Sequence, residues 1–330
     1  MSVKFLIIRF SSIGDIVLTS PVVRMLKQQV EGAEIHYLTK EKFAFIPENN
    51  PYIDKTISFD GDWKKMISAL KSESYDHIID LHNNLRTRSI KKRLALPYFT
   101  FDKLNIKKWI YVNFKKNLLP NKSIVDRYLE SVSVFDIKND HKGLDYFIPK
   151  KDKYALSEEI KAYPFFDVIV IGGTYFTKQI PENKIIELID KSDSPFVLLG
   201  GKEDISKAKA IQKQCNKVLF NLVGEINLNQ SASVIEQARA VVTSDTGLMH
   251  IAAAFNKPIL SLWGNTVPEF GMYPYLPHSD SKIFEIKLSC RPCSKIGFDK
   301  CKKEHFNCMQ KINIDDVNNH LKKIAIESNK

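Results

Sequence analysis

The sequence predicts an α/β protein with two consecutive Rossmann-like domains, each built on a parallel sheet. Short apolar runs of strand length alternate with longer amphipathic stretches from end to end, which is the pattern of βα units around parallel sheets. The chain has 330 residues, of which 44% are hydrophobic, and a chain of this length suggests two domains rather than one. An irregular, charged segment separates two series of strand-like runs.

The first domain is expected over residues 1–150 and the second over 151–330. In the first, apolar runs predict strands at 3–10, 34–39, 55–59, 76–81 and 98–101. A helical stretch follows at 123–134, and the segment 136–153 is interpreted as an interdomain linker. In the second, strands are predicted at 167–171, 196–199, 217–221, 240–243 and 259–263.

Ligands of open parallel sheets bind beyond the carboxyl ends of the strands, so the turns after these strands are where we expect the chemistry. The most informative turn is 244–247, between the apolar run 240–243 and an Ala-rich stretch. Asp245 and Thr246 are good helix caps, and Gly247 lets a ligand approach the backbone. His250 lies one turn further along. The turn is interpreted either as a well-capped helix start or as a phosphate site made by free backbone N–H groups.

Two further turns of the second domain carry groups suited to a nucleotide diphosphate. The pair Gly172-Gly173 ends one predicted strand, Thr174 adds a hydroxyl, and Lys178 adds a mobile charge for a phosphate. After the next strand, Glu203 follows a Gly-Gly turn and is placed to accept hydrogen bonds from ribose hydroxyls. With the Asp245 turn, these loops predict a nucleotide-diphosphate site spread over one edge of the second sheet.

The first strand leads into a turn that contains Ser12, Gly14 and Asp15. The chain has neither G-x-x-x-x-G-K-[ST] nor G-x-G-x-x-G, which disfavours a P-loop kinase and a simple dinucleotide enzyme. Asp15 falls near a helix start, whose positive end stabilises the ionised carboxylate. The residue is interpreted either as a helix cap or as a general base.

Charge is concentrated in one segment of the chain. The formal net charge is +11, and residues 86–122 hold eleven Lys and Arg but one acid, Asp102. Aromatic residues are interleaved with these charges between Tyr98 and Phe114. The segment is either a solvated basic face over core aromatics or a surface for anionic lipid headgroups, an acidic glycolipid or nucleic acid. We favour an anionic acceptor or a membrane surface.

The cysteines leave three interpretations open. Four of the five cluster as Cys290-x2-Cys293-x7-Cys301-x6-Cys308, so they bind zinc, form a disulfide clip or stay reduced. Because the cluster lies beyond the last predicted strand, an active-site role is not expected. No run of ~18 apolar residues is present, and the apolar start is interrupted by Arg9 and Asp15, so we expect neither a membrane span nor a signal peptide.

With these motifs laid out, the chain resembles glycosyltransferase family 9, the lipopolysaccharide heptosyltransferases, over essentially its whole length. The resemblance rests on the motifs at 11–15, 173–178, 200–203 and 244–250. It implies the GT-B fold, in which two Rossmann-like domains face each other across a cleft. It also implies that the first domain binds the acceptor and that the second holds the nucleotide sugar.

The resemblance assigns a role to each matched residue. It implies that Asp15 deprotonates the acceptor hydroxyl and that the configuration at the anomeric carbon inverts, with no metal required and an ADP-sugar, ADP-heptose, as co-substrate. For donor binding it points to Thr174, Lys178, Glu203, Asp245, Thr246, Gly247 and His250. For the acceptor, an anionic glycolipid of the lipid A and core type, we expect contacts from Ser12, Gly14, His82, Asn84, Arg86 and Arg88. The expected location is the cytoplasm, peripheral at the inner face of the inner membrane.

One departure keeps an alternative open. Family members carry acids before the matched lysine and Trp-Pro after it, whereas here Tyr175-Phe176-Thr177 precede Lys178 and Ile180-Pro181 follow it. A GT-B transferase that uses another nucleotide sugar for a different surface polysaccharide is therefore the alternative. The hypothesis of a nucleic-acid-binding protein acting through residues 86–122 does not account for Asp15, Lys178 and Asp245. No nucleic-acid partner is therefore expected.

Overall fold

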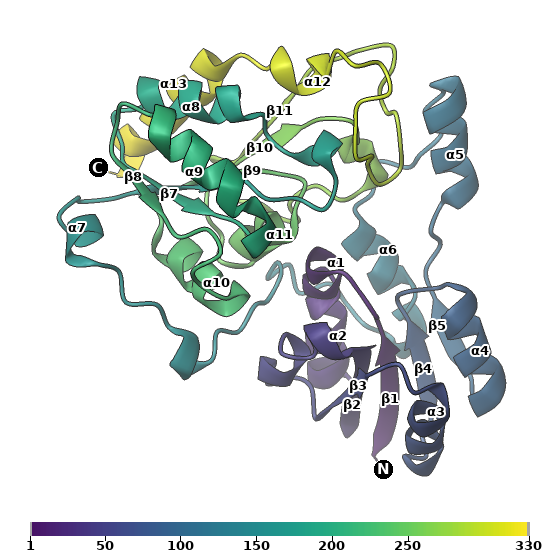
Figure 1. Cartoon of the computed structure of the whole chain (residues 1–330). Coiled ribbons are helices and arrows are strands. Elements are labelled where there is room, and N and C mark those ends of the chain that lie inside the picture. Colours follow the sequence, from purple (N-terminus) through teal and green to yellow (C-terminus); the bar gives the residue numbers. More distant parts are fainter. Residues whose placement is uncertain (1, 329–330) are drawn as a thin grey trace. The chain divides into compact units, whose positions relative to one another are not determined.

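The protein, described over residues 2–328 of a computed structural model, divides into two compact units (Figure 1). The first unit comprises the chain up to residue 104 together with residues 122–147. The second comprises residues 105–121 and the chain from 148 onward. The crossover between units therefore lies at 147/148, close to the expected 150/151, but the segment 105–121 groups with the second unit instead of the first.

The first unit contains a five-stranded parallel sheet in the order β3-β2-β1-β4-β5. Helices α3 and α4 cover the face that carries Leu6 and Ile8, and α2 packs against α6. The strands are β1 (Val3–Ile8), β2 (Ala33–Lys40), β3 (Lys55–Phe59), β4 (His77–Asp80) and β5 (Tyr98–Thr100). The helices are α1 (Ile13–Val17), α2 (Ser20–Gln29), α3 (Trp63–Ser72), α4 (Leu85–Leu94) and α6 (Ile124–Glu130), with 3-10 turns η1 (Glu41–Phe43), η2 (Pro47–Asn49) and η3 (Ser133–Phe135).

The second unit contains a six-stranded parallel sheet in the order β11-β10-β9-β6-β7-β8. Helix α8 packs against α9 and α13, and α10 packs against α11. The strands are β6 (Asp167–Val170), β7 (Phe196–Leu199), β8 (Leu219–Asn221), β9 (Val241–Ser244), β10 (Ile259–Trp263) and β11 (Lys282–Glu285). The helices are α5 (Asn105–Phe114), α7 (Glu158–Lys161), α8 (Glu182–Lys191), α9 (Ile205–Gln214), α10 (Leu228–Gln237), α11 (Gly247–Ala254), α12 (Asn307–Gln310) and α13 (Ile314–Ser328), with η4 (Lys150–Asp152), η5 (Phe176–Lys178), η6 (Lys202–Asp204) and η7 (Pro268–Phe270).

The predicted alternation of strands and helices is confirmed. Each of the ten predicted strands is present, with ends that differ by at most two residues, because fully buried apolar runs such as Phe196–Leu199 belong in parallel sheets. Strand β11 was missed, since three of its four residues are exposed and Lys282 and Glu285 interrupt the apolar signal. The predicted helix at 123–134 ends at Glu130 and continues only as the 3-10 turn η3.

The interpretation of 136–153 as a linker is wrong for its first part. Residues 136–147 belong to the first unit, where the Arg24 side chain, 2% exposed, fixes them. Its guanidinium donates to both carboxylate oxygens of Asp140 over 2.7 and 2.9 Å, to the carbonyl of Gly143 over 2.9 Å, and pairs with Asp145. A buried arginine needs such partners to offset the loss of hydration, so this segment is held in place.

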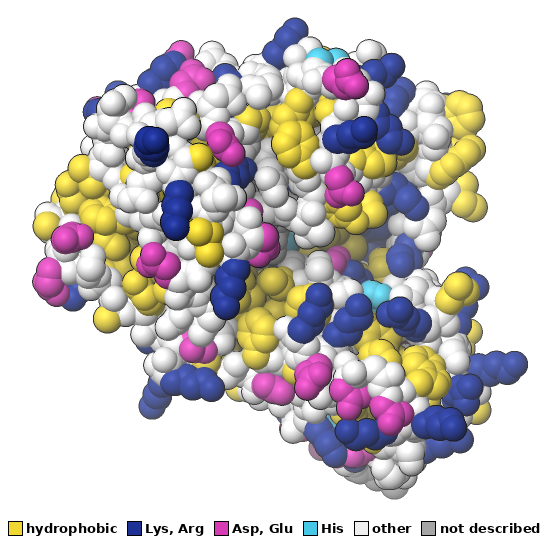
Figure 2. Space-filling model, in the orientation of Figure 1, with side chains coloured by type: hydrophobic (Ala, Val, Ile, Leu, Met, Phe, Trp, Pro, Cys, Tyr) yellow, Lys and Arg dark blue, Asp and Glu magenta, His cyan; other side chains and the backbone are white. Residues whose placement is uncertain are grey.

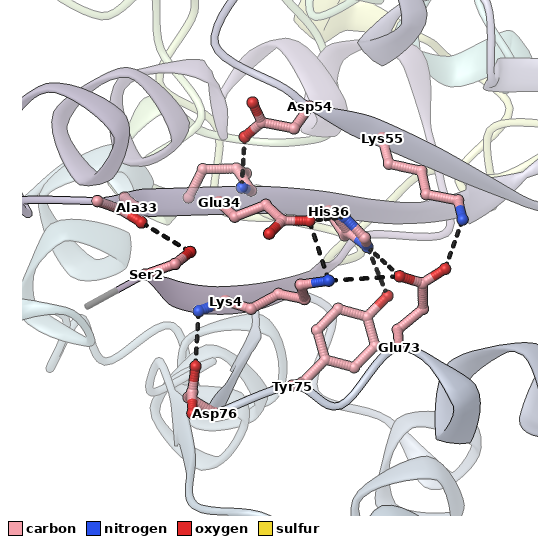
Figure 3. A network of polar contacts seen from close by, with 12 residues as sticks. Ser2, Lys4, Ala33, Glu34, His36, Asp54, Lys55, Glu73, Tyr75 and Asp76 are labelled. Carbon is pink, nitrogen blue, oxygen red and sulfur yellow. Dashed lines mark hydrogen bonds and ion pairs between the residues drawn. The ribbon is translucent and has the colours of Figure 1, made fainter.

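A network of polar side chains closes the edge of the first sheet where its strands begin (Figure 3). The His36 ring, 2% exposed, lies between the Tyr75 hydroxyl at 2.9 Å and a Glu34 oxygen at 2.9 Å. Lys4 pairs with Glu34 at 3.0 Å and with Glu73 at 3.5 Å. The network ties the starts of β1 and β2 to the segment before β4. The opposite edge of the sheet, where the strands end, is not part of this network.

Candidate functional site

The second sheet reverses its strand order between β6 and β9, and ligands bind at such a switch point. Strands β6, β7 and β8 extend to one side, whereas β9, β10 and β11 extend to the other. The turns after β6 and β9 therefore meet at the carboxyl edge of the sheet. A Cβ added to Gly173 would lie 3.9 Å from the Thr246 methyl, which shows how closely the two turns approach.

An ion pair joins these turns. The ammonium of Lys178, at the end of η5, lies 2.5 Å from Oδ2 of Asp245 in the turn after β9. Thr266, in the turn after β10, donates its hydroxyl to the same carboxylate oxygen over 3.2 Å. The two charged side chains are 18% and 10% exposed, so the ion pair is partly shielded from water. Asp245 thus holds the lysine charge at the edge of the sheet.

The start of α11 supplies backbone donors beside this pair. Thr246 is the N-cap, and its hydroxyl accepts from the amide of Met249 over 3.4 Å and lies 3.1 Å from the Thr243 hydroxyl. Gly247 is the first helical residue. The amides of a first helical turn have no partner inside the helix and attract anions. His250 sits further into the helix and is 2% exposed, so its assignment to phosphate or sugar stays a prediction.

The loop after β7 completes the same edge. The carboxylate of buried Asp204 accepts the Gly201 amide over 2.9 Å, and a Cβ on Gly172 would meet this carboxylate at 2.4 Å. Burial raises the pKa of Asp204, partly offset by the Gly201 hydrogen bond. Asp204 therefore links the turns after β6 and β7. Glu203 is exposed and folds over Gly201, and Thr174 is exposed in the turn after β6.

The first sheet has its own switch point, between β1 and β4, and Arg9 occupies it. Its guanidinium lies 2.6 Å from Oδ1 of Asp15 in the first turn of α1, and it donates to the carbonyls of Ser11 and Leu81 over 2.8 and 2.5 Å. Its fourth partner is the Tyr128 hydroxyl at 3.0 Å. Arg9 thus ties the turn after β1 to the turn after β4 and orients Asp15.

Asp15 is held in its ionised form. Its second oxygen accepts the amide and the hydroxyl of Ser12 over 3.0 and 2.8 Å. Burial alone would raise the pKa of Asp15, but the positive charge of Arg9 and the two Ser12 hydrogen bonds outweigh it and lower that pKa. Ser12 is exposed and Gly14 is buried within α1. Asp15 therefore closes the capping box of α1 and is at the same time a charged group beside a sheet switch point.

His82 lies in the turn after β4, with its ring 5.6 Å from that of Phe10. Burial, together with the charges of Arg9 and Lys103, lowers the pKa of His82 to about 4 from its ordinary 6.5. Within residues 2–328, Nδ1 of this ring has no hydrogen-bond partner. At neutral pH the ring is therefore uncharged.

The remaining predicted acceptor residues begin α4. Asn84 is the N-cap and accepts the Thr87 amide over 3.0 Å. It therefore stabilises the start of α4 independently of any ligand. Arg86 and Arg88 are exposed. Lys91, which the sequence groups with them as a surface charge, is 8% exposed and pairs with Asp80 at 2.8 Å. That lysine is a structural residue, because its carboxylate partner is fully buried.

The four clustered cysteines lie together, and all are free thiols. Cys290, Cys293, Cys301 and Cys308 line one pocket with His305. Across residues 2–328, no three or more His, Cys, Asp and Glu side chains are arranged to hold a metal ion. Burial raises the pKa of Cys293 and of Cys308 to about 11, so both are protonated at neutral pH. The disulfide clip is not formed, and the structure has reduced thiols.

The cysteine segment packs against two loops of the second sheet. The Thr177 hydroxyl accepts the amide of Phe298 over 2.8 Å, and the Cys293 amide donates to the carbonyl of Asn265 over 3.1 Å. The segment therefore packs against η5 and the turn after β10, which adjoin Lys178 and Thr266. It supports the loops of the second sheet and is not remote from them.

The structure brings together Lys178, Asp245, Thr246 and Gly247, as predicted, and adds residues that sequence reasoning missed. Arg9, Asp204 and Thr266 were not singled out. The sequence could have indicated Arg9, because this charged residue follows an otherwise apolar run and a buried arginine needs an acidic partner. Thr266 gave no comparable signal, since its contact with Asp245 depends on strand order. The hydrogen bond of Asp204 to Gly201 is local, but its closeness to Gly172 also depends on strand order.

Solved structures with this fold define the class of protein. An Escherichia coli heptosyltransferase solved with ADP matches with a TM-score of 0.70 and 21% identity, over 97% of this chain and 99% of that one. A glycosyl transferase family 9 structure from Veillonella parvula matches with a TM-score of 0.81 and 19% identity, over 99% and 98%. The two parallel α/β units therefore have the GT-B fold of these glycosyltransferases.

The sequence matches give the family. The lipopolysaccharide heptosyltransferase 1 of Campylobacter coli is 27% identical over 288 residues, which cover 80% of this chain and 84% of that protein. The pattern of glycosyltransferase family 9 (heptosyltransferase) matches residues 63–303. The chain belongs to glycosyltransferase family 9 and is an enzyme of the heptosyltransferase family.

Proposed function

We propose that this enzyme transfers a heptose from ADP-heptose to the core of a lipopolysaccharide acceptor, with inversion at the anomeric carbon. The observation that carries the proposal is the Lys178–Asp245 pair beside the start of α11, at the switch point of the second sheet. A lysine and free helix amides on one edge suit a diphosphate. The names of the relatives, lipopolysaccharide heptosyltransferase 1 and a heptosyltransferase solved with ADP, support this donor and acceptor.

In the proposed reaction an acceptor hydroxyl oxygen forms a bond to the anomeric carbon as the bond to the ADP oxygen breaks. The hydroxyl proton passes to Asp15, and the bonding electron pair leaves with ADP. Negative charge therefore grows on the diphosphate in the transition state, where Lys178 and the amides near Thr246 and Gly247 act most strongly. Because fixed protein charges do this work, no divalent metal is required for catalysis.

The remaining assignments belong to the same proposal. Thr174 contacts the diphosphate, Glu203 the ribose, and His250 the phosphates or the sugar. On the first unit, an anionic glycolipid acceptor is bound by Ser12, Gly14, His82, Asn84, Arg86 and Arg88. The enzyme works on the cytoplasmic side of the inner membrane, as a peripheral protein. No helix within residues 2–328 is both long and apolar enough to cross a bilayer.

Nucleotide binding tests the donor assignment first. Thermal unfolding is followed with ADP, UDP, GDP and CDP for the wild type, Lys178→Ala, Asp15→Asn and, as a matched control, Lys209→Ala on the exposed side of α9. A nucleotide at 100 times its Kd stabilises the folded state by about 2.7 kcal/mol. We expect selective stabilisation by ADP, and we expect Asp15→Asn and Lys209→Ala to retain it. In Lys178→Ala the affinity for ADP is expected to fall roughly 10- to 100-fold.

Turnover tests the chemistry. Asp15→Asn is expected to lower kcat by about 10²- to 10⁴-fold while ADP binding is kept, and treatment with a chelator is expected to leave kcat unchanged. Selective stabilisation by UDP, GDP or CDP instead of ADP would favour the alternative, a GT-B enzyme with another nucleotide sugar. No response to any of the four nucleotides would contradict the donor site.

A further inference from the structure

Helix α5 presents an apolar face that nothing in its own unit covers. Ile106 and Trp109, three residues apart on this ten-residue helix, are 76% and 53% exposed. Phe114 at the end of the helix is 67% exposed, and its ring lies 5.4 Å from that of Trp109. Leu118, just past the helix, is 43% exposed. Hydrophobic and basic side chains gather over α5 in the space-filling view (Figure 2). Clustered exposed apolar residues of this size mark an interaction surface.

The opposite face of α5 is anchored to the second unit. The Tyr111 ring packs edge-on against Phe270 with centroids 6.1 Å apart, and the Lys108 ammonium lies 5.7 Å above the same ring. At the end of the helix, Lys115 donates to the carbonyls of Cys290 and Pro292 over 3.2 and 2.8 Å. Residues spaced three and four apart share a helix face. The anchoring of 108 and 111 therefore leaves the side of 106 and 109 directed away from the unit.

The charges of the segment that contains α5 have one sign. The second-unit segment 105–121 contains four lysines and no Asp or Glu. Lys107 and Lys116 are exposed and, within residues 2–328, form no ion pair. Exposed aliphatic and aromatic residues flanked by unpaired lysines suit the boundary between acyl chains and anionic headgroups. A tryptophan half-exposed on such a face is placed where tryptophan partitions in bilayers.

We infer that α5 docks the enzyme on an anionic phospholipid surface, with Ile106 and Trp109 entering the headgroup region and Lys107 and Lys116 facing lipid phosphates. This inference rests on the proposed function, because an acceptor embedded in a membrane requires the enzyme to work at that surface. A helix whose other face is fixed by Tyr111 and Lys115 loses little conformational entropy when it docks. The docking element is therefore built into the donor-binding unit.

Vesicle binding by the full chain tests the inference. Co-sedimentation is measured with vesicles of phosphatidylcholine alone and with an equimolar mixture with phosphatidylglycerol, together with the shift in tryptophan emission. The other two tryptophans, at 63 and 263, are partly and fully buried, so Trp109 dominates a shift caused by lipid. We expect the wild type to bind the anionic vesicles with a blue shift of its tryptophan emission. The double variant Ile106→Ser with Trp109→Ser is expected to partition onto these vesicles at least about tenfold more weakly.

Two further variants complete the test. A matched control, Val218→Ser with Ile326→Ser, removes exposed apolar residues elsewhere on the same unit and is expected to bind like the wild type. Lys107→Gln with Lys116→Gln is expected to weaken binding only to the anionic vesicles and to flatten its dependence on salt. The inference is overturned if the Ile106 and Trp109 variant partitions like the wild type. It is also overturned if α5 variants change binding to an oligonucleotide but not to vesicles.

The outcome separates this inference from the proposed function. Stabilisation by ADP is measured on the same α5 variants and is expected to match the wild type, since the helix is not part of the donor site. Normal ADP binding with normal vesicle binding in the Ile106 and Trp109 variant rejects only the docking helix. Loss of lipid binding in that variant, with no ADP response in the wild type, supports the docking helix and rejects the proposed donor.

Discussion

Arg9 fixes the turn after β1 and the ionised state of Asp15 in that turn. Its guanidinium forms an ion pair with Asp15 and hydrogen bonds to Leu81 and Tyr128, so one side chain joins two loops and sets the charge of the carboxylate. The lowered pKa of Asp15 keeps it ionised over the whole physiological range. A carboxylate with a lowered pKa is a weak base in free solution, so the proposed role of Asp15 as a base requires the acceptor hydroxyl to be held close to it.

The neighbouring ring of His82 makes stability depend on pH. Its pKa is near 4 in the folded protein and 6.5 ordinarily, so between these values the unfolded chain binds more protons and stability falls as the pH falls. Between pH 7 and pH 5 this contribution amounts to about 2 kcal/mol. We expect the free energy of unfolding of His82→Gln, measured by urea titration, to fall less over this range than that of the wild type.

Other groups titrate equally in the two proteins, so the difference between their slopes isolates His82. Equal slopes for the wild type and His82→Gln would contradict the neutral, buried ring. Protonation of His82 below pH 4 removes no further stability through this group, because the folded and unfolded chains then bind the same proton.

At the level of elements, the turn after β10 supports η5. A Cβ on Gly264 would lie 2.5 Å from the backbone oxygen of Thr177 and 3.1 Å from a Met309 side-chain carbon. The backbone of Thr177 is in turn tied to Phe298 of the cysteine segment. Since η5 ends in Lys178, the position of the lysine depends on close packing between turns that are far apart in sequence.

We therefore expect Gly264→Ala to cost about 1–3 kcal/mol of stability, because backbone atoms have no easy way to move aside. Thermal unfolding without nucleotide measures the cost, and nucleotide titration is expected to show weaker ADP binding. The control is Gly173→Ala, which is expected to cost less, because its Cβ meets the flexible Gln179 side chain at 3.3 Å and the Thr246 methyl at an ordinary contact distance of 3.9 Å. Equal stability of Gly264→Ala and the wild type would show that the turn is looser than described.

At the scale of the whole molecule, each unit has its own sheet and its own buried core. The predicted donor residues all belong to the second unit, whereas Asp15 and the predicted acceptor residues belong to the first. If the proposed assignment holds, donor binding adds contacts first to the loops after β6, β7 and β9. The proposal therefore divides the two binding functions between two separately packed cores.

Hydrogen exchange measured with and without ADP tests this division. We expect amides in 171–178, 200–204 and 244–250 to gain protection, because a ligand stabilises the regions it contacts against local opening. Amides in β1 to β5 of the first unit are expected to exchange unchanged. Equal gains in the strands of both units would contradict a donor site confined to the second. Lys178→Ala serves as the control, in which the gains are expected to be smaller at the same ADP concentration.

The sequence by itself determined the two parallel α/β units, the ten predicted strands and the turns that carry the site, because periodicity, glycine and capping residues act locally. Tertiary structure alone decided the Lys178–Asp245 and Arg9–Asp15 pairs, the burial of Lys91 and the place of α5 in the second unit. The reason is strand order. Which turns meet depends on the reversal beside β6 and β1, and that reversal arises from packing between distant segments, which no local pattern encodes.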